Sequence, residues 1–287
     1  MKIESLDGKV ILRGATNFVP KQIFECGQAF RWEVKEDGSY TTVAFGKVLN
    51  VKIKDGLVEL DTTIEEFEKI WRDYFDLDRD YVAMREELSF EETLKDAMEY
   101  GSGIRILNQD PFETIITFII SQNSNITRIK NAVNFIANEY GEKIDEEHSR
   151  FPTPSELAMA KVEDLREKAR VGYRDRYIVE SSKMIRDGLL DMEVLRKADI
   201  ETARKELMKL PGVGPKVCDC ILLFAFKRSE SFPVDVWIKR VMEELYLGKV
   251  TPKGKIADEG RRIFGQNAGF AQQYLFYYGR ENKVGKE

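Results

Sequence analysis

Lys216 and Asp235 are the residues whose types and positions best suit chemistry in this sequence. Lys216 directly follows the Gly-rich stretch Leu210–Gly214 and precedes an apolar run, Val217–Phe226, with helical spacing. Two glycines two residues apart permit a positive φ and a close approach by another backbone, and the next helix offers unpaired N–H groups at its positive end. Such a turn is suited to binding phosphate, although a PGVG turn between two helices is often only a corner.

The position of Lys216 in the first turn of a helix bears on its reactivity. The positive end of a helix disfavours an ammonium group, so it favours the neutral, nucleophilic amine. The simpler interpretation is a solvated surface lysine, which is the commonest environment of this residue. Asp235 ends the segment PVD just before another apolar-periodic run, which is a strong N-cap signal. Capping alone would explain Asp235, and it is compatible with a second role.

Other polar segments could bind a base or a nucleic acid. Gln272 and Phe276 lie four residues apart in a predicted helix, so they share one face. A glutamine amide offers a donor and an acceptor to the edge of a base, and a phenyl ring stacks on it. An amphipathic core helix with a surface glutamine is the alternative. Two more segments, Ser121–Arg128 and Gly172–Tyr177, have the composition of caps and turns.

At this point the residues carry a family resemblance. LPGVGPKVCDCILLFAF followed by PVDVW resembles the helix-hairpin-helix, Gly/Pro-Asp loop (HhH-GPD) superfamily of DNA glycosylases, and specifically its lysine-bearing 8-oxoguanine branch. The resemblance implies that Lys216 attacks C1′ of the damaged nucleotide and forms a Schiff base. It also implies that Asp235 assists deprotonation and steadies the cationic sugar. The monofunctional glycosylases of the superfamily lack this lysine.

The resemblance also implies a pocket for the damaged base. The segment Cys26–Trp32 resembles the G-Q-x-F-R-W segment of the 8-oxoguanine enzymes, in which the glycine carbonyl, here that of Gly27, accepts a hydrogen bond from the N7–H of oxidised guanine. Normal guanine would place its N7 lone pair against that carbonyl, so the contact discriminates. Without the resemblance, Gly27 would be assigned to a helix-to-strand turn. The expected base pocket comprises Gly27, Gln272, Phe276 and Cys220.

The same resemblance implies a set of DNA-binding residues. Asn123 matches the residue that fills the hole left by the extruded base, and Arg128 matches a residue that recognises the orphaned cytosine. The G-Y-R segment assigns Tyr173 to wedging and Arg174 to the cytosine. The remaining expected contacts to DNA come from Gly212 and Gly214 of the hairpin and from Trp237. Trp237 departs from the histidine common in the eukaryotic enzymes, and its indole offers only one donor.

Composition indicates a soluble globular protein. Of the 287 residues, 43% are hydrophobic and 33% charged, and no apolar run is long enough to span a membrane. The net charge of −5 is unusual for a DNA-binding protein. However, residues 59–99 carry fifteen acidic and five basic side chains, a net of −10 that leaves +5 for the rest of the chain. The charge distribution is therefore compatible with DNA binding.

Cysteine and histidine usage argues against a disulfide or metal framework. The three cysteines, Cys26, Cys218 and Cys220, lack framework spacing, and no cysteine follows Cys220 to form the iron–sulfur loop of some relatives. His148 is the one histidine and lies in a polar segment. No metal or other cofactor is expected. The N-terminus MKIESLDGKV lacks the apolar core of a signal peptide, so we expect a cytoplasmic, nucleoid-associated monomer whose partner is duplex DNA with 8-oxoguanine opposite cytosine.

The elements that must position these residues form an α+β fold. We expect a helix at residues 20–26, an antiparallel sheet joined by Asp-Gly hairpins at residues 37–38 and 55–56, and helices from Thr63 onward. Two helices are expected in residues 102–140, around the polar break at 121–128. Residues 1–80 are expected to form the sheet subdomain and 81–287 the helical HhH-GPD domain, with the hairpin at 204–226 and the Gly/Pro-Asp loop at 230–236. The expected strands are residues 10–12, 30–34, 40–45, 48–53 and 57–60.

Three functions are compatible with these patterns. The first is a bifunctional glycosylase and β-lyase acting on 8-oxoguanine in DNA. The second is a monofunctional alkylpurine glycosylase of the same fold, against which Lys216, Gly27 and Gln272 all argue. The third is a noncatalytic DNA-binding module that uses the hairpin only for phosphates, which would leave the amine and carboxylate unexplained.

Overall fold

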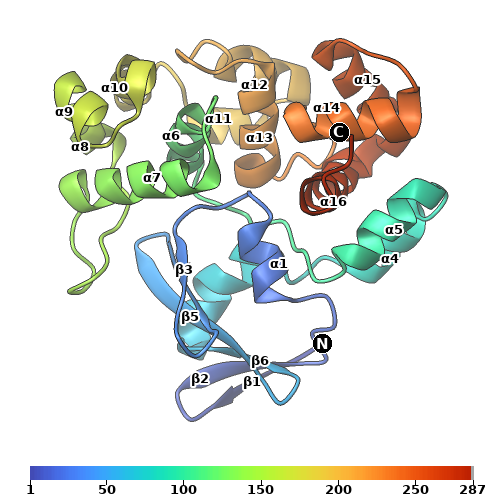
Figure 1. The fold of residues 1–287 in the computed structure, drawn as a ribbon. Helices are drawn as coiled ribbons and strands as arrows, with labels where there is room; N and C mark the ends of the chain where they lie inside the picture. Colours follow the sequence, from blue (N-terminus) through green and yellow to red (C-terminus); the bar gives the residue numbers. More distant parts are fainter. Residues whose placement is uncertain (286–287) are drawn as a thin grey trace.

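The N-terminal part of the protein is a six-stranded antiparallel sheet that lies below a larger helical part (Figure 1). The structure is a computed structural model that describes residues 1–285. The strand order in the sheet is β1-β2-β6-β5-β4-β3. The strands are β1 (Lys2–Leu6), β2 (Lys9–Arg13), β3 (Trp32–Val34), β4 (Tyr40–Ala44), β5 (Lys47–Lys54) and β6 (Leu57–Leu60).

The hairpins of the sheet follow the predicted turns. Each of the five expected strands is present, as β2 to β6, although β3 begins at Trp32 rather than Phe30. Gly38 and Gly56 have φ angles of 79° and 76°, as the Asp-Gly hairpin turns require. Strand β1 was not expected. It is an edge strand whose residues are exposed or half-buried, so its sequence KIESL has no apolar alternation to reveal it.

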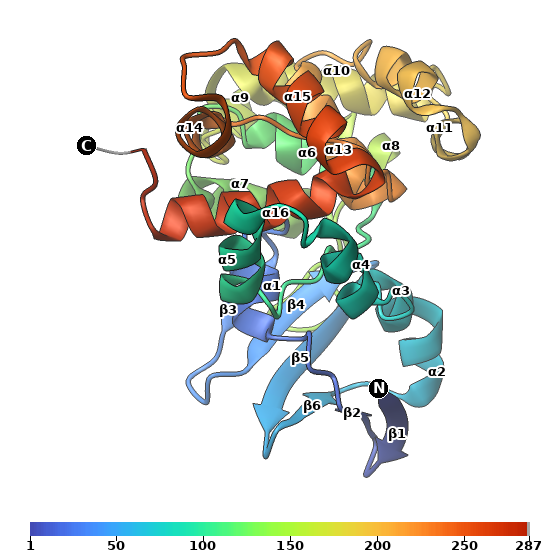
Figure 2. The ribbon, with the colours of Figure 1, turned by 90° about the vertical axis from the view of Figure 1, so that its right-hand side faces the viewer.

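The sheet is covered on one face by aromatic side chains. Helix α1 (Pro20–Glu25) contributes Phe24, and the helical segment Ile64–Tyr74 contributes Phe67, Trp71 and Tyr74 to a buried core. That segment comprises α2 (Ile64–Glu66), a π-helical turn (Phe67–Trp71) and α3 (Arg72–Tyr74). Helix α1 lies between the sheet and the helical part (Figures 1 and 2). Gly27 follows two residues after its last residue, Glu25.

The helical part forms a second hydrophobic core, to which Cys26 and Phe30 of the N-terminal part also contribute. Its first helices, α4 and α5, lie beside α16, and the other helices form the layer at the top of Figure 1. The helices are α4 (Tyr81–Leu88), α5 (Glu92–Tyr100), α6 (Pro111–Ile120), α7 (Ile126–Tyr140), α8 (Pro154–Leu157), α9 (Val162–Glu167), α10 (Asp175–Arg186), α11 (Met192–Lys197), α12 (Ile200–Leu207), α13 (Pro215–Phe226), α14 (Val236–Met242), α15 (Lys253–Phe264) and α16 (Ala268–Glu281).

Residues 102–110 correct one expectation, because the first helix of the predicted pair begins at Pro111 and not at Ser102. The preceding segment is a turn at residues 102–103 followed by irregular chain, and it is held by Gln28, which is fully buried. Its amide donates to the carbonyl of Arg105 (2.8 Å) and accepts from the N–H of Leu107 (2.8 Å). Because Gln28 directly follows Gly27, this network fixes the position of Gly27 against the helical part.

Two further features follow from the sequence. The cysteines Cys26, Cys218 and Cys220 are buried free thiols. Within residues 1–285, no helix combines the length and the apolar character that a membrane crossing requires.

Candidate active site

A cavity of about 690 Å³ lies where the N-terminal part meets the helices. Its walls come from the end of α1, the α6–α7 connection, α13, the start of α14 and α16. The cavity thus unites segments more than 240 residues apart in the sequence. Seven of the predicted site residues line it: Gly27, Lys216, Cys220, Asp235, Trp237, Gln272 and Phe276.

The hairpin between α12 and α13 places Lys216 at the cavity wall. Pro215 is the first residue of α13, where its missing N–H costs nothing, and Lys216 is the second. The Nζ atom of Lys216 lies 5.2 Å from the ring centroid of Phe118. One turn later, Cys220 faces the same cavity, and burial raises the pKa of this thiol to about 11, against the opposing effect of the Lys216 charge. Cys220 is therefore a neutral wall residue at neutral pH.

Asp235 has the predicted capping role at the same cavity. Its Oδ1 accepts a hydrogen bond from the N–H of Ile238 (2.8 Å) at the start of α14. Burial raises the pKa of Asp235 above its usual value, and the bond from Ile238 and the charge of Lys216 oppose that increase. A carboxylate with a raised pKa beside an amine is the arrangement expected of an acid–base pair.

Helix α16 provides the opposite wall. Gln272 is 5% exposed, and its Oε1 is buried without a hydrogen-bond partner among the residues that the structure describes. Phe276 lies one turn further along the same face. Gly27 has φ of 81°, and a Cβ atom there would lie 3.1 Å from Cε1 of Phe276. The glycine thus lets the backbone approach the phenyl ring closely.

Apart from Trp237, the predicted DNA-binding residues do not line the cavity, and hydrogen bonds connect the segments that carry several of them. Nδ2 of Asn123 donates to Oη of Tyr173 (3.2 Å), and the guanidinium of Arg174 donates to the carbonyl of Gln122. Nε2 of Gln122 in turn donates to the carbonyl of Gly212 (2.9 Å) in the hairpin. The α6–α7 connection, the turn before α10 and the hairpin are thereby joined.

The arginines of this surface differ in exposure. Tyr173 is 52% exposed, whereas Arg174 is 8% exposed, and its guanidinium lies over the Tyr173 ring (4.5 Å) and donates to the carbonyl of Val171 (2.8 Å). Arg128 is exposed in the first turn of α7. In this arrangement the Arg174 side chain supports the loop beneath Tyr173, and its predicted contact with cytosine requires those bonds to open.

The two hairpin glycines are not equivalent. Gly212 has φ of 81°, and a Cβ atom there would lie 2.7 Å from Cδ2 of Tyr177. Gly214 has φ of −92°, and a Cβ atom there would have no neighbour within 4 Å. Of the two glycines that permit a positive φ, only Gly212 adopts one, so only Gly212 needs to be glycine for the fold.

Several cavity residues carried no clear sequence signal. Phe30 and Phe118 line the cavity from apolar runs that look like ordinary core. Gln273 and Arg280 of α16 also line it. Arg280 is four residues after Phe276 and eight after Gln272, so helical spacing could have placed it on the same face.

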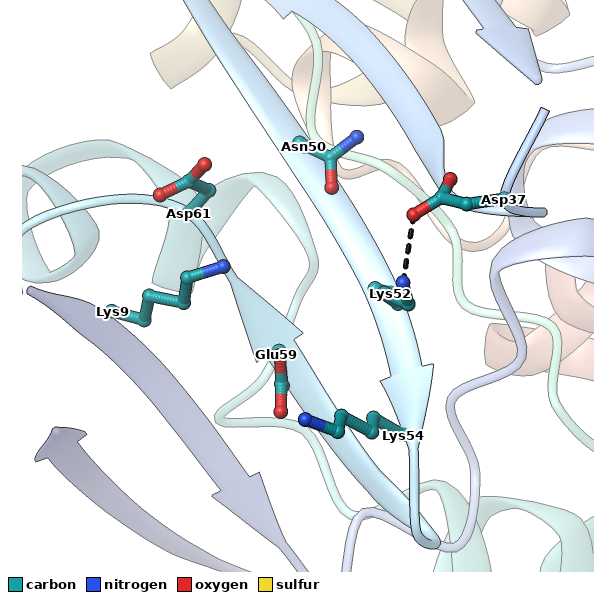
Figure 3. Close-up of a pocket in the computed structure, with 7 residues that line it drawn as sticks. All are labelled: Lys9, Asp37, Asn50, Lys52, Lys54, Glu59 and Asp61. Atoms are coloured by element: carbon teal, nitrogen blue, oxygen red, sulfur yellow. Dashed lines mark hydrogen bonds and ion pairs between the residues drawn. The ribbon is translucent and has the colours of Figure 1, made fainter. Parts of the chain in front are cut away.

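A second hollow, of about 470 Å³, lies on the sheet and contains none of the predicted site residues (Figure 3). Three lysines and three carboxylates line it together with Asn50, and Lys52 pairs with Asp37 (2.7 Å). Because these charges balance, the hollow offers neither an activated group nor a field for an ionic ligand.

Two protein-family models match this chain and show the family to which it belongs. The model of the 8-oxoguanine DNA glycosylase N-terminal domain matches residues 10–115, and that of the HhH-GPD superfamily base excision DNA repair protein matches residues 116–265, more than half of the chain. The chain belongs to the HhH-GPD superfamily. The α12–α13 hairpin and the Asp235 loop of this HhH-GPD protein fall within the second match.

Relatives of this HhH-GPD protein resemble it over most of its length. A probable N-glycosylase/DNA lyase of Methanothermobacter thermautotrophicus is 32% identical, over 77% of this chain and 76% of its own. An N-glycosylase/DNA lyase of Arabidopsis thaliana is 29% identical, over 88% and 75%. The solved 8-oxoguanine glycosylase/lyase of Clostridium acetobutylicum, in complex with double-stranded DNA containing cytosine opposite 8-oxoG, is 41% identical over 99% of both chains, with a TM-score of 0.95.

Proposed function

We propose that this HhH-GPD protein is a bifunctional 8-oxoguanine DNA glycosylase and abasic-site lyase. The observation that carries the proposal is the meeting of Lys216 and Asp235 with Gly27, Gln272 and Phe276 in one cavity. The names of the relatives, N-glycosylase/DNA lyase and 8-oxoguanine glycosylase/lyase, agree with this assignment. A noncatalytic module would have no use for a base-sized cavity lined by an amine and a carboxylate.

The cavity geometry supports the following reaction. The neutral amine of Lys216 attacks C1′ of the flipped nucleotide, and the C1′–N9 bond breaks as the N–C1′ bond forms. Asp235 accepts a proton from the attacking amine and, while ionised, stabilises the positive charge that develops on the sugar. The departing base takes the C1′–N9 electron pair and picks up a proton. Cleavage of the C1′–O4′ bond, with a proton delivered to O4′, then opens the sugar ring and gives the imine of Lys216. Loss of a 2′ proton from this imine expels the 3′ phosphate by β-elimination, which nicks the strand.

Recognition of the base is assigned to α16 and the end of α1. The unpaired, buried Oε1 of Gln272 needs a donor, and the Watson–Crick edge of guanine offers N–H groups. Phe276 stacks on the base, the carbonyl of Gly27 accepts from N7–H, and Cys220 contributes to the wall. The base would therefore lie between the two structural parts of the protein, for which we propose the ranges 1–80 and 81–287.

We expect substitutions in this pocket to have separable effects. Phe276→Ala should cost roughly 1–3 kcal/mol of stacking for any bound purine. Gln272→Ala should chiefly slow excision of guanine-derived bases, because it removes the hydrogen bonds to the Watson–Crick edge of guanine. Single-turnover excision of 8-oxoguanine and of a second purine lesion measures both effects, with Phe90→Ala, an exposed phenylalanine, as the matched control. Equal loss on both lesions in Gln272→Ala would contradict the assignment.

Duplex DNA is the proposed partner, bound through the connected surface next to the cavity. Asn123 and Tyr173 enter the duplex beside the flipped base, Arg128 and Arg174 contact the orphaned cytosine, and Trp237 lies at the cavity wall near the sugar. These assignments rest on the resemblance to the 8-oxoguanine branch, and the exposure of Asn123, Tyr173 and Arg128 is compatible with them. Binding by a monomer is sufficient, because the cavity is completed within one chain.

The hairpin glycines give a test of phosphate binding. Gly214→Ala should weaken DNA affinity roughly tenfold while leaving thermal stability unchanged, because its Cβ meets no protein atom but would crowd a phosphate. The loss should be equal for damaged and undamaged duplex, since phosphate contacts carry no sequence information. Gly212→Ala should instead lower stability, by about 1–3 kcal/mol, through its positive φ and the clash with Tyr177. Affinity lost only for lesion DNA would refute a phosphate role for Gly214.

Competitive excision tests the proposed substrate. Wild-type protein should release 8-oxoguanine in preference to an alkylated adenine from matched duplexes, and it should nick the strand afterwards. A preference for the alkylated base, without nicking, would replace the proposal by the monofunctional alkylpurine alternative.

A further inference from the structure

Arg280, on α16, lines the proposed base pocket and carries an unpaired donor. It lies on the face of α16 that carries Gln272 and Phe276, it lines the cavity, and its side chain is 16% exposed. Its guanidinium carbon lies 5.4 Å from the ring centroid of Phe276. No role has been given to this cation in the reaction described above.

The guanidinium is fixed on one side only. Nη2 of Arg280 donates to the carbonyl of Glu25 (2.6 Å), and Nε donates to Oε1 of Glu281 (2.9 Å). Nη1 is buried and has no hydrogen-bond partner within residues 1–285. Since an unpaired buried donor is costly, the unpaired Nη1 of a residue that lines the cavity indicates a ligand that accepts a hydrogen bond.

Nη1 also lies beside the carbonyl-bearing turn at Gly27. A Cβ atom built on Gly27 would be 3.6 Å from Nη1. Nε2 of Gln273 donates to the carbonyl of Cys26 (2.8 Å), so α16 holds the carbonyls of both residues that precede Gly27. Helix α16 therefore sets the distance between the end of α1 and its own Gln272 and Phe276.

We propose that Arg280 is a specificity-determining residue that donates a hydrogen bond from Nη1 to the C8 carbonyl oxygen of flipped 8-oxoguanine. The proposal rests on the proposed function. Oxidation changes two neighbouring positions of guanine: N7 becomes a donor, and C8–H becomes a carbonyl acceptor. An acceptor at Gly27 and a donor at Arg280, side by side, match both changes.

The Gly27 carbonyl and Nη1 of Arg280 together would distinguish 8-oxoguanine from guanine more strongly than the Gly27 carbonyl alone. Undamaged guanine would set its N7 lone pair against the Gly27 carbonyl and leave Nη1 of Arg280 against a C–H group, still unpaired. A site built around polar contacts strongly rejects an analogue that lacks them. Because the donor is a fixed guanidinium, its bond to a carbonyl is of the stronger, ionic kind.

The test separates base recognition from sugar chemistry. Arg280→Met should lower single-turnover excision of 8-oxoguanine by roughly ten- to a hundredfold. The rate of strand cleavage at a preformed abasic site, which contains no base, should change by less than about twofold, which corresponds to a small difference in activation free energy. Arg13→Met, which removes an arginine paired with Glu4 on the sheet, serves as the matched control and should alter neither rate. Arg280→Lys, which keeps the charge but cannot make all three contacts, should also lower excision.

Binding gives a second readout. In a Lys216→Gln background, Arg280→Met should reduce the ratio of affinities for 8-oxoguanine and guanine duplexes, with guanine affinity unchanged. Equal losses of excision and abasic-site cleavage, or of thermal stability in both Arg280 variants, would show a merely structural role and overturn the proposal. Unchanged excision would also overturn it. If wild-type protein itself fails to excise 8-oxoguanine, the proposed function has failed, and the inference with it.

Discussion

Lys216→Gln is expected to abolish the covalent adduct that wild-type protein forms with lesion DNA in the presence of borohydride. The amine attacks C1′ and passes through an imine, which hydride reduces to a stable bond. Glutamine has no nucleophilic amine, so we expect excision to fall by at least about 10³-fold. Adduct formation is measured as a shift of the labelled strand in a denaturing gel.

The same variant should still bind DNA. Lys216 lies on the cavity wall, whereas the hairpin glycines and the surface around Asn123 and Tyr173 are untouched. Lys9→Gln, in the charge-balanced hollow of Figure 3, is the matched lysine control and should keep full trapping. An adduct that persists in Lys216→Gln would place the nucleophile elsewhere and remove the main support for the mechanism.

Asp235→Asn is expected to reduce excision by about 10²–10³-fold while thermal stability changes little. The asparagine carbonyl can still accept the hydrogen bond from Ile238, so most of the α14 cap remains. What is lost is a negative charge beside the developing sugar cation, a contribution commonly worth several kcal/mol. Single-turnover rates and thermal unfolding of the same preparation measure the two effects.

The sign of the stability change is set by the raised pKa of Asp235. Because the pKa is above its unfolded value, the folded state binds a proton more tightly, and stability falls as pH rises from the usual aspartate range through the raised pKa. The neutral asparagine removes this dependence, so it should not be less stable than aspartate at neutral pH on this account.

Asp199→Asn provides a matched control. Asp199 caps α12 through a bond from the N–H of Thr202 (2.9 Å), as Asp235 caps α14, but it does not line the cavity. Its replacement should leave excision unchanged. If Asp235→Asn lost activity only in proportion to stability, capping would be the whole role of Asp235.

Local patterns in the sequence determined several parts of the fold. The Asp-Gly turns and apolar alternation set the hairpins of β3 to β6, and the Asp235 cap set the start of α14, because these signals act between residues close in sequence. Two predictions were incomplete or wrong because the deciding interactions are not local in the sequence. Strand β1 is an exposed edge without alternation. Residues 102–110 precede the helix instead of opening it, because Gln28, distant in sequence, bonds the backbone of Arg105 and Leu107.

The sequence by itself also determined the chemical groups of the site, since Lys216 after its hairpin and Gln272 four residues before Phe276 were visible as motifs. Only the tertiary structure decided how they meet. The segment after α1 packs against α16, which brings Gly27 to Phe276 and to Nη1 of Arg280. Separately, a hydrogen bond to the carbonyl of Gln122 ties Arg174 to the α6–α7 connection. These outcomes depend on contacts between segments up to about 255 residues apart, and burial and hydrogen-bond pairing across such distances leave no periodic signal in the local sequence.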